Sequence, residues 1–323
     1  MEINAAFFMV KKIITLLKYI GMVINTHNFN KIINDEEMKK NKGRFYDKDH
    51  YHTIITTDSD GWWTDSLGER HLLFKFRRGV IPPELQERAI TNYKKMAQQK
   101  HPNRGAAGGV MDSGLTRKWI GKTSEAKGTK SNIAGFYDRP RREHKGKLGT
   151  RLACRLTAFT LNKSELWKNS IPFIKHCDDL YKGLCSKKWE VQKREWDSVP
   201  EELRIPETSF TTVTVNFNWR TACHLDTGDF CGGMGNLIVV GRGEWEGGML
   251  GFPQFGVAID TRAGDFLLMD VHQWHCNTEI LGTDNRKNFR MSFVLYLRED
   301  MSKCSSGNTK TLNNIKYWLK SPE

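Results

Sequence analysis

The chain has 323 residues, of which 38% are hydrophobic, and its formal net charge is +13 at pH 7. This length allows one sizeable hydrophobic core with a small accessory region. Its seven cysteines are an odd number and include no C-x-x-C pair, which argues against a disulfide framework and a zinc knuckle and favours a reducing intracellular compartment, cytoplasm or nucleus, over secretion. The basic balance favours a polyanionic partner, although a basic surface can also serve solubility alone.

Residues 5–24 resemble a signal or membrane segment only superficially. Lys11, Lys12 and Lys18 interrupt the segment, so no run reaches the roughly 20 apolar residues that a bilayer-spanning helix needs. Its apolar residues instead recur at helical spacing. We therefore expect a docking helix and no integral membrane segment, with binding at a membrane surface as the alternative.

The remainder of the first 95 residues carries weaker signals. Residues 26–50 are polar and charged and predict a linker or a charged helix, and residues 58–63 predict a turn. A helix is expected from Glu84 to Lys100, because Pro82 and Pro83 precede it and His101-Pro102 follows it. Residues 1–95 are thus predicted to be an N-terminal helical extension with a linker.

The segment from residue 117 to 151 is strongly basic. It contains eleven Lys or Arg against three acidic residues, a local excess of eight positive charges, and it is rich in glycine and serine. We expect a flexible loop that follows the phosphates of a nucleic acid, with a merely solvated loop as the alternative. The candidate phosphate contacts are Arg117, Lys118, Arg139, Arg141 and Arg142.

Helical patterns extend from residue 161 to 198. This region contains His176-Cys177-Asp178, a His-x-Asp pair that could suggest a metal site. The surrounding apolar residues recur at helical spacing, so an ordinary surface helix is the better interpretation.

Three strands follow, and each carries residues suited to chemistry. Residues 210–220 alternate, with Val213, Val215 and Phe217 on one face and threonines and asparagines on the other; if this register holds, His224 and Asp226 continue the polar face beyond the strand. The apolar run 265–274 leads to His272 and His275. Only one of these should bind a metal. His275 is favoured because it follows the end of the run, and His272 is expected to be structural or to orient a ligand.

The strand 290–298 places Arg290, Ser292, Tyr296 and Arg298 on one face, where the first three could face a common cavity. An amphipathic strand with its polar side in water would explain Arg298.

His224-Leu225-Asp226, followed by His275 forty-nine residues later and by Arg290 a further fifteen on, indicates a particular chemistry. Two imidazoles and one carboxylate can occupy one face of an Fe(II) ion and leave positions open for O2 and a keto acid. An arginine can bind the far carboxylate of that acid through two parallel hydrogen bonds.

The stretches TTVTVNFNWRTACHLDTGDF, GNLIVV, PQFGVAIDTRAGDFLLMDVHQWHCNTEI and RMSFVLYLR resemble the TET and base-J-binding-protein family of DNA pyrimidine dioxygenases, nearest to its short forms. RGAAGGVMD, GFYDRP and CRLTAFT resemble weaker parts of the same pattern, and the resemblance covers roughly residues 100 to 300. The long insert and cysteine-rich region of the animal enzymes are missing, so their preference for methylated CpG is not implied.

The resemblance implies Fe(II) ligands at His224, Asp226 and His275, and 2-oxoglutarate held by Arg290 and Ser292. It also implies that Tyr296 stacks on the target base and that Asp229 reads the edge of that base. An ionised carboxylate accepts hydrogen bonds and so favours the amino group of 5-methylcytosine over thymine.

We therefore expect an α+β protein with a double-stranded β-helix core, the jelly-roll barrel of cupins, flanked by helices that precede the core. The expected domains are the extension 1–95, a dioxygenase domain 96–300 with its core at about 205–300, and a tail 301–323. The expected enzyme is a monomer that hydroxylates the 5-methyl group of a pyrimidine in DNA, with Fe(II), 2-oxoglutarate and O2. The alternatives are an oxygenase of the same fold acting on RNA, a protein side chain or a small molecule, and a catalytically inactive DNA-binding module.

Overall fold

The computed structural model describes residues 23–100, 104–113, 116–119, 129–138 and 154–304. The helix expected over residues 5–24, the three arginines at 139, 141 and 142, and most of the expected C-terminal tail lie outside these residues. Within them, no helix combines the length and the apolar character that crossing a membrane requires.

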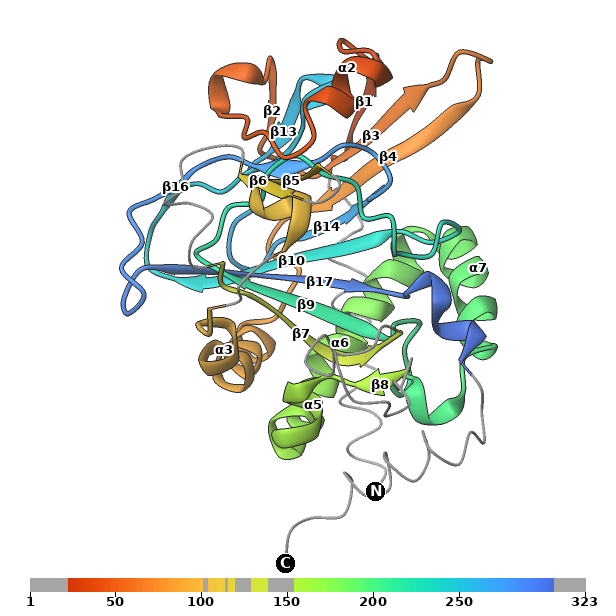
Figure 1. Cartoon of the computed structure of the whole chain (residues 1–323), viewed down its shortest axis with the longest axis vertical. Coiled ribbons are helices and arrows are strands. Elements are labelled where there is room, and N and C mark those ends of the chain that lie inside the picture. The colour runs from red at the N-terminus through yellow and green to blue at the C-terminus, as the bar shows by residue number, and fades with distance from the viewer. Residues whose placement is uncertain (1–22, 101–103, 114–115, 120–128, 139–153, 305–323) are drawn as a thin grey trace, which may run out of the picture.

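A large sheet of nine strands forms the centre of the protein (Figure 1). Its strand pairs are antiparallel except for β1 with β3. In spatial order the strands are β1 (Asn25–Phe29), β3 (Ser59–Thr64), β4 (Arg70–Arg77), β14 (Phe266–Met269), β10 (Gly235–Arg242), β17 (Phe289–Tyr296), β9 (Thr212–Phe217), β7 (Ser131–Tyr137) and β8 (Arg155–Leu156).

A smaller sheet faces one side of the large one. It consists of β15 (Cys276–Asn277), β12 (Leu250–Phe252), β13 (Val257–Ile259) and β2 (Thr53–Ile55). Apolar side chains from both sheets form one core between them, including Leu237 and Leu267 from the large sheet and Phe252 and Val257 from the small one. Two facing sheets with a shared core are the jelly-roll arrangement, and the expected double-stranded β-helix is confirmed.

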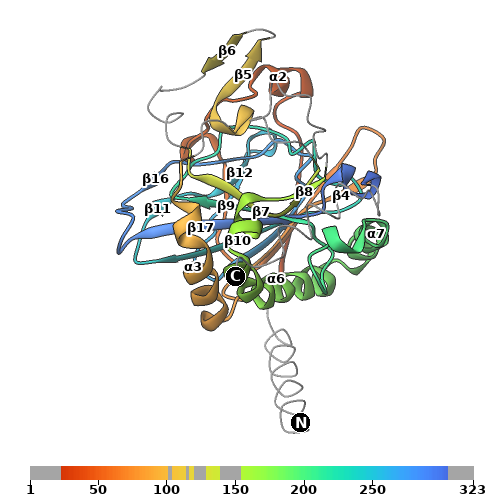
Figure 2. The same ribbon diagram turned by 60° about the horizontal axis from the view of Figure 1, so that its bottom comes forward.

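Helices cover the other face of the large sheet (Figures 1 and 2). Val213, Val215 and Phe217 pack there against residues of these helices in a second core, as the alternating pattern of β9 predicts. The helices are α3 (Pro83–Ala97), α5 (Ala158–Asn162), α6 (Ser164–Leu184) and α7 (Ser186–Asp197). The expected helices over residues 84–100 and 161–198 are therefore confirmed to within a few residues.

The remaining elements are short and lie in the connections between the longer helices and strands or after β17. They are the helix α2 (Asp35–Lys40), the strand pairs β5 (Val110–Ser113) with β6 (Thr116–Trp119) and β11 (Glu246–Gly247) with β16 (Ile280–Leu281), and the 3-10 helices η1 (Lys48–His50), η2 (Gly105–Gly108), η4 (Glu201–Leu203), η5 (Pro253–Phe255) and η6 (Glu299–Lys303).

The N-terminal region differs from its prediction. Strands β1 to β4, within residues 25–77, belong to the two main sheets and are no separate helical extension. Residues 58–63, expected to be a turn, lie almost entirely in β3. The sequence was misleading because Asp58, Asp60 and Gly61 are typical of turns, whereas pairing with β4 and burial of Trp63 make this segment a strand.

Two further features differ from what the sequence indicated. The segment 117–151 is not one flexible loop, because its first residues lie in β6 and residues 131–137 form β7 within the large sheet. Cys154 and Cys304 are joined by a disulfide whose Cα atoms lie 6.0 Å apart; it is a single bond and not a framework, and the cysteine count did not indicate it. A single long-range pair leaves no spacing signal in a sequence, so it was not foreseeable.

Candidate active site

A β-bridge between His224 and His275 brings two imidazoles together. Each residue donates its backbone N–H to the carbonyl of the other at 3.1 Å, and the ring centroids lie 4.4 Å apart. Asp226 completes the group, since its Oδ1 lies 3.5 Å from Nε2 of His224 and its Oδ2 lies 3.5 Å from Nε2 of His275. The three ligand atoms lie within 4.8 Å of one another, so one ion could contact all of them.

Backbone carbonyls set the orientation of both rings. Nδ1 of His224 lies 2.7 Å from the carbonyl oxygen of Ala222, and Nδ1 of His275 lies 2.9 Å from that of Gln273. Because a carbonyl only accepts hydrogen bonds, each Nδ1 must carry the proton. Each Nε2 therefore faces Asp226, which is the orientation that metal-binding histidines commonly have.

The protonation states of this group suit a divalent cation. Burial and the neighbouring His275 lower the pKa of His224 to about 4, so this ring is neutral near pH 7. Burial would raise the pKa of Asp226, but the hydrogen bond of His275 and the charge of His224 hold it well below its usual value. Burial acts downward on the pKa of His275, yet the Asp226 carboxylate raises it overall. A cation placed at the carboxylate would take over the role of that second imidazole proton.

His272 lies apart from this group and has structural partners. Its Nε2 donates to the carbonyl of Asp229 at 3.2 Å, and its Nδ1 lies 3.6 Å from the carboxylate of Asp270. The Asp270 carboxylate raises the pKa of His272. This agrees with the expectation that His275, and not His272, completes the ligand set.

Arg290 is a buried cation without a carboxylate partner among the described residues. Its side chain is 2% exposed, its Nη2 donates to the Thr261 hydroxyl at 3.3 Å, and its Nε has no hydrogen-bond partner there. Burial, with the nearby Arg262, lowers the pKa of Arg290 to about 10. Leaving such a group unpaired is costly, and a bound carboxylate would satisfy it.

The backbone at Gly248 passes close to Arg290, and the absence of a side chain at Gly248 leaves room for the guanidinium. Gly248 has φ of 68°, and a β-carbon there would lie 3.0 Å from Cδ and Nε of Arg290. The turn before β12 thus depends on a glycine where the guanidinium passes.

Polar residues of β9 and β17 meet between the sheets. The side-chain amide of Asn216 donates to the Ser292 hydroxyl at 3.3 Å, and its Oδ1 is buried without a partner in the described residues. Thr214 and Tyr296 share a hydrogen bond of 3.0 Å between their hydroxyls. The polar face that the sequence indicated is therefore real; it faces the interior of the barrel and is buried from solvent.

Asp229 is buried beside Tyr296. Its Oδ2 has no hydrogen-bond partner within the described part of the chain, and its backbone N–H donates to the carbonyl of Asp226. Burial and the Asp226 carboxylate raise the pKa of Asp229 well above its usual value, against the opposing charge of Arg298. The ionised state assumed from the sequence is therefore disfavoured while Asp226 carries an uncompensated charge.

Arg298 is not in water, contrary to the amphipathic interpretation of its strand. It is 6% exposed and forms two hydrogen bonds with Asp138, at 2.7 and 3.2 Å, while its guanidinium lies 4.4 Å from the centre of the Tyr137 ring. The partner was not predictable because it lies 160 residues away in the sequence.

Several other residues near the site were missed from the sequence. Asn216 was visible only as part of a polar strand face, and Thr261 carried no signal. The positive charge of Arg104 makes a smaller contribution to the lowered pKa values of both His224 and Asp226. It stands in the RGAAGG stretch, which was noticed only as part of a family pattern.

Of the five predicted phosphate contacts, the structure describes only the backbone of Arg117 and Lys118. Arg117 and Lys118 lie in β6, in register with Asp112 and Met111 of β5. The other three arginines fall outside the described residues.

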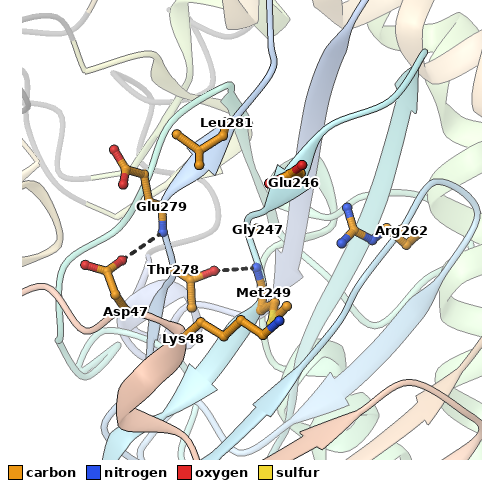
Figure 3. A pocket seen from close by; sticks show the side chains of 9 residues that line it. All are labelled: Asp47, Lys48, Glu246, Gly247, Met249, Arg262, Thr278, Glu279 and Leu281. Atoms are coloured by element: carbon orange, nitrogen blue, oxygen red, sulfur yellow. Dashed lines mark hydrogen bonds between the residues drawn. The ribbon is translucent and has the colours of Figure 1, made fainter.

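Figure 3 shows a cavity of about 380 Å³ that none of the predicted site residues line. Its lining carries mixed charge, with three acidic and two basic side chains. The lining residues are Asp47, Lys48, Glu246, Gly247, Met249, Arg262, Thr278, Glu279 and Leu281. We therefore place the active site at the histidine pair and not at this cavity.

A double-stranded β-helix that carries two histidines, one carboxylate and a buried arginine with no carboxylate partner in the described residues defines the class of iron(II)- and 2-oxoglutarate-dependent oxygenases. The family model Tet_JBP, the oxygenase domain of the 2OGFeDO superfamily, matches residues 133–299. The chain therefore belongs to the Tet_JBP family, and it carries a dioxygenase domain whose cofactor and cosubstrates are Fe(II), 2-oxoglutarate and O2.

Curated relatives agree with this assignment. The chain is 36% identical over 169 residues to thymine dioxygenase JBP1 of Trypanosoma brucei brucei, a match that covers 52% of this chain and 19% of that protein. It is 34% identical over 213 residues to the bifunctional helicase and thymine dioxygenase JBP2 of Leishmania tarentolae, covering 65% of this chain and 18% of that one. The chain thus spans about a fifth of these relatives' length.

The structure of NgTET1 in complex with 5mC DNA has the same fold, with a TM-score of 0.50 and 12% identity over 88% of this chain and 100% of that one.

Proposed function

We propose that this protein hydroxylates the 5-methyl group of a pyrimidine base in DNA. One observation carries the proposal: the His224, Asp226 and His275 ligand atoms converge on one point, and the same barrel holds the buried guanidinium of Arg290, which has no carboxylate partner among the described residues. A divalent ion and a dicarboxylate would satisfy both groups at once.

The chain's own residues would divide the work as follows. His224, Asp226 and His275 hold the iron, and Arg290 holds the far carboxylate of 2-oxoglutarate, with Ser292 as a further donor. Asn216 donates to the Ser292 oxygen, which leaves the hydroxyl proton of Ser292 free to point at that carboxylate. Iron and 2-oxoglutarate together supply the oxidation of a methyl C–H bond, with succinate and CO2 as coproducts.

Tyr296 and Asp229 would hold the base. Tyr296 is fixed by Thr214, so its ring presents a defined surface for stacking. Asp229 has an unpaired buried oxygen beside it, which suits a group that forms its hydrogen bond only when a base is present.

Thymine is the first candidate base, because relatives that share about a third of the residues are named thymine dioxygenases. The preference for 5-methylcytosine expected from Asp229 has no support from these relatives and stays a prediction. A carboxylate can also accept the N3 proton of thymine, so Asp229 is compatible with either base.

A base inside a duplex cannot bring its methyl group to a buried metal. The target nucleotide must therefore be flipped out or lie in a single strand. The basic segment 117–151 would contact the phosphates and supply binding energy independent of sequence.

Mass spectrometry of nucleosides tests the proposal. Matched oligonucleotides that contain thymine or 5-methylcytosine are incubated with the full chain, Fe(II), 2-oxoglutarate and O2. We expect 5-hydroxymethyluracil, or 5-hydroxymethylcytosine if the second candidate is right. Succinate formation that does not depend on DNA but rises with RNA, a protein or a small molecule would contradict the choice of substrate.

A further inference from the structure

The GFYDRP stretch supplies Tyr137 and Asp138, to which the proposed function assigns no role. Both contact Arg298, which lies two residues past the end of β17. Nε and Nη2 of Arg298 donate to the two carboxylate oxygens of Asp138 at 2.7 and 3.2 Å, and the guanidinium lies 4.4 Å from the centre of the Tyr137 ring. The side chains of Arg298 and Asp138 are 7% and 1% exposed. A guanidinium held on both oxygens of a buried carboxylate has a fixed orientation.

This orientation places the guanidinium against the backbone of Gly228. A β-carbon at Gly228 would lie 2.7 Å from Nη2 and 3.0 Å from Nη1 of Arg298, which is closer than a real side chain could come without displacing something. Arg298 therefore fills the space that a side chain at this position would need. Gly228 stands directly before Asp229, the residue that is proposed to read the base.

Backbone hydrogen bonds attach the turn of residues 228–230 to the segment that follows β17. Phe230 donates its N–H to the carbonyl of Leu297 at 2.9 Å, and the residue after Arg298 donates its N–H to the carbonyl of Gly228 at 3.0 Å. Asp229 and Arg298 face each other in a β-bridge between these two hydrogen bonds. The position of the Asp229 backbone thus depends on the backbone and on the side chain of Arg298.

The nearby metal ligand is attached to a different segment. Asp226 donates its backbone N–H to the carbonyl of Val271 at 3.1 Å, and a single backbone hydrogen bond of 3.2 Å joins it to Asp229. Asp229 keeps a buried Oδ2 that has no hydrogen-bond partner in the described part of the chain. A change at Arg298 can therefore move Asp229 while Val271 still holds Asp226.

We propose that Arg298, fixed by Asp138, is a positioning residue that sets the place of Asp229 against the target base and so helps to determine which pyrimidine is oxidised. The inference rests on the proposed contact between Asp229 and the base. Arg298 acts through the backbone of Gly228 and Asp229. Hydrogen bonds weaken steeply when their angle departs from linear, so a small shift of Asp229 is enough to change the discrimination between two bases.

The double variant Asp138→Leu with Arg298→Met tests the role, because it removes the pair without leaving a buried charge. Replacing a buried ion pair by apolar side chains is often neutral for stability, so we expect a folded protein, which thermal unfolding followed by circular dichroism checks. The ratio of 5-hydroxymethyluracil to 5-hydroxymethylcytosine from matched oligonucleotides should change by about tenfold, and the KM for the preferred oligonucleotide should rise. Iron affinity and the KM for 2-oxoglutarate should stay the same.

Combination with Asp229→Asn shows whether Arg298 acts through Asp229. If it does, Asp229→Asn already removes the contact, and adding the double variant should change the product ratio no further. If the two effects on the ratio add, Arg298 influences the choice of base by another route and the proposed route is wrong.

A second ion pair and a second variant complete the test. Arg77 of β4 pairs with Asp60 of β3 at 2.8 Å, and Asp60→Leu with Arg77→Met is the matched control, which should leave the product ratio unchanged. If the Asp138 and Arg298 double variant folds poorly, Gly228→Ala tests the same contact from the other side. Its β-carbon would displace the guanidinium or the turn, so the ratio should shift here too.

The outcomes separate this inference from the proposed function. A wild-type product ratio in the folded double variant and in Gly228→Ala overturns the positioning role of Arg298. An unchanged ratio in Asp229→Asn overturns both the reading of the base by Asp229 and the role of Arg298. A wild-type protein that hydroxylates neither base contradicts the proposed function itself.

Discussion

His224, Asp226 and His275 are arranged for a metal before any metal is present, because backbone carbonyls fix Nδ1 of both imidazoles and both Nε2 atoms then face the carboxylate. Alanine at any of the three should abolish iron binding and turnover. The affinity for iron should fall by more than the roughly 10- to 100-fold that follows removal of a residue that only hydrogen-bonds to a ligand, since here a ligand itself is removed. Titration with Fe(II) under anaerobic conditions measures it.

His272→Ala is the matched control for these variants, because His272 bonds to Asp229 and Asp270 and not to the ligand set. It should keep most of its iron affinity. If His272→Ala lost the metal and His275→Ala kept it, the ligand assignment would be wrong.

Arg290 should be intolerant of lysine. One ammonium cannot reproduce two parallel hydrogen bonds to a carboxylate, so Arg290→Lys should raise the KM for 2-oxoglutarate at least about tenfold with the net charge unchanged. Arg262→Lys is the control, since Arg262 is a neighbouring cation that already pairs with Asp260 at 2.6 Å. An unaltered KM in Arg290→Lys would remove Arg290 from the cosubstrate site.

Asp229 governs the choice of base if it reads the base edge. One good contact to a base contributes roughly 1–3 kcal/mol, so Asp229→Asn should change discrimination between thymine and 5-methylcytosine by about ten- to a hundredfold. Yields of the two hydroxymethyl products from matched oligonucleotides measure this. Identical selectivity in both proteins would show that Asp229 does not read the base.

At the scale of elements, the second His-x-Asp pair of the sequence has a structural use. Asp178 of α6 accepts hydrogen bonds from the backbone and hydroxyl of Ser209 and from the Trp189 indole. It thereby ties α6 to α7 and to the segment that enters β9. The surface-helix interpretation of this pair was right about the helix but missed that Asp178 is buried.

Asp178→Ala should therefore destabilise the protein without touching the metal site. Removing a buried acceptor leaves several donors unsatisfied, so we expect a loss of about 2–4 kcal/mol in the free energy of unfolding. Urea denaturation measures the loss, with Asp179→Ala at the exposed neighbouring position as the control. An equal iron affinity in both variants is expected, and a selective loss of iron in Asp178→Ala would contradict a purely structural role.

At the scale of the whole molecule, the net charge of +13 should appear as a salt dependence of DNA binding. Replacing Arg139, Arg141 and Arg142 by alanine should flatten the slope of log affinity against log salt by about one unit per lost phosphate contact, and base preference should stay the same. Fluorescence anisotropy with a labelled oligonucleotide measures the slope.

A control triple variant at the exposed residues Lys187, Lys188 and Arg194 of α7 removes the same charge elsewhere. Equal slopes for the two triple variants would mean that only total charge matters. In that case the segment 117–151 makes no specific phosphate contacts.

The sequence by itself determined the local features: the alternating faces of β9 and β17, the helices α3, α6 and α7, and the order of the His, Asp and Arg residues. These depend on periodicity and on motif spacing over short stretches, which neighbouring residues fix. The same logic failed for residues 58–63, whose local turn composition was overridden by pairing with β4.

Only the tertiary structure decided which distant residues meet. The pairs Arg298 with Asp138, Cys154 with Cys304, Arg290 with Thr261, and His224 with His275 come from segments far apart in the chain. The β-helix brings them together through strand order and register, which depend on the packing of two whole sheets. No local pattern encodes that packing, because each contact depends on where every other strand has already been placed.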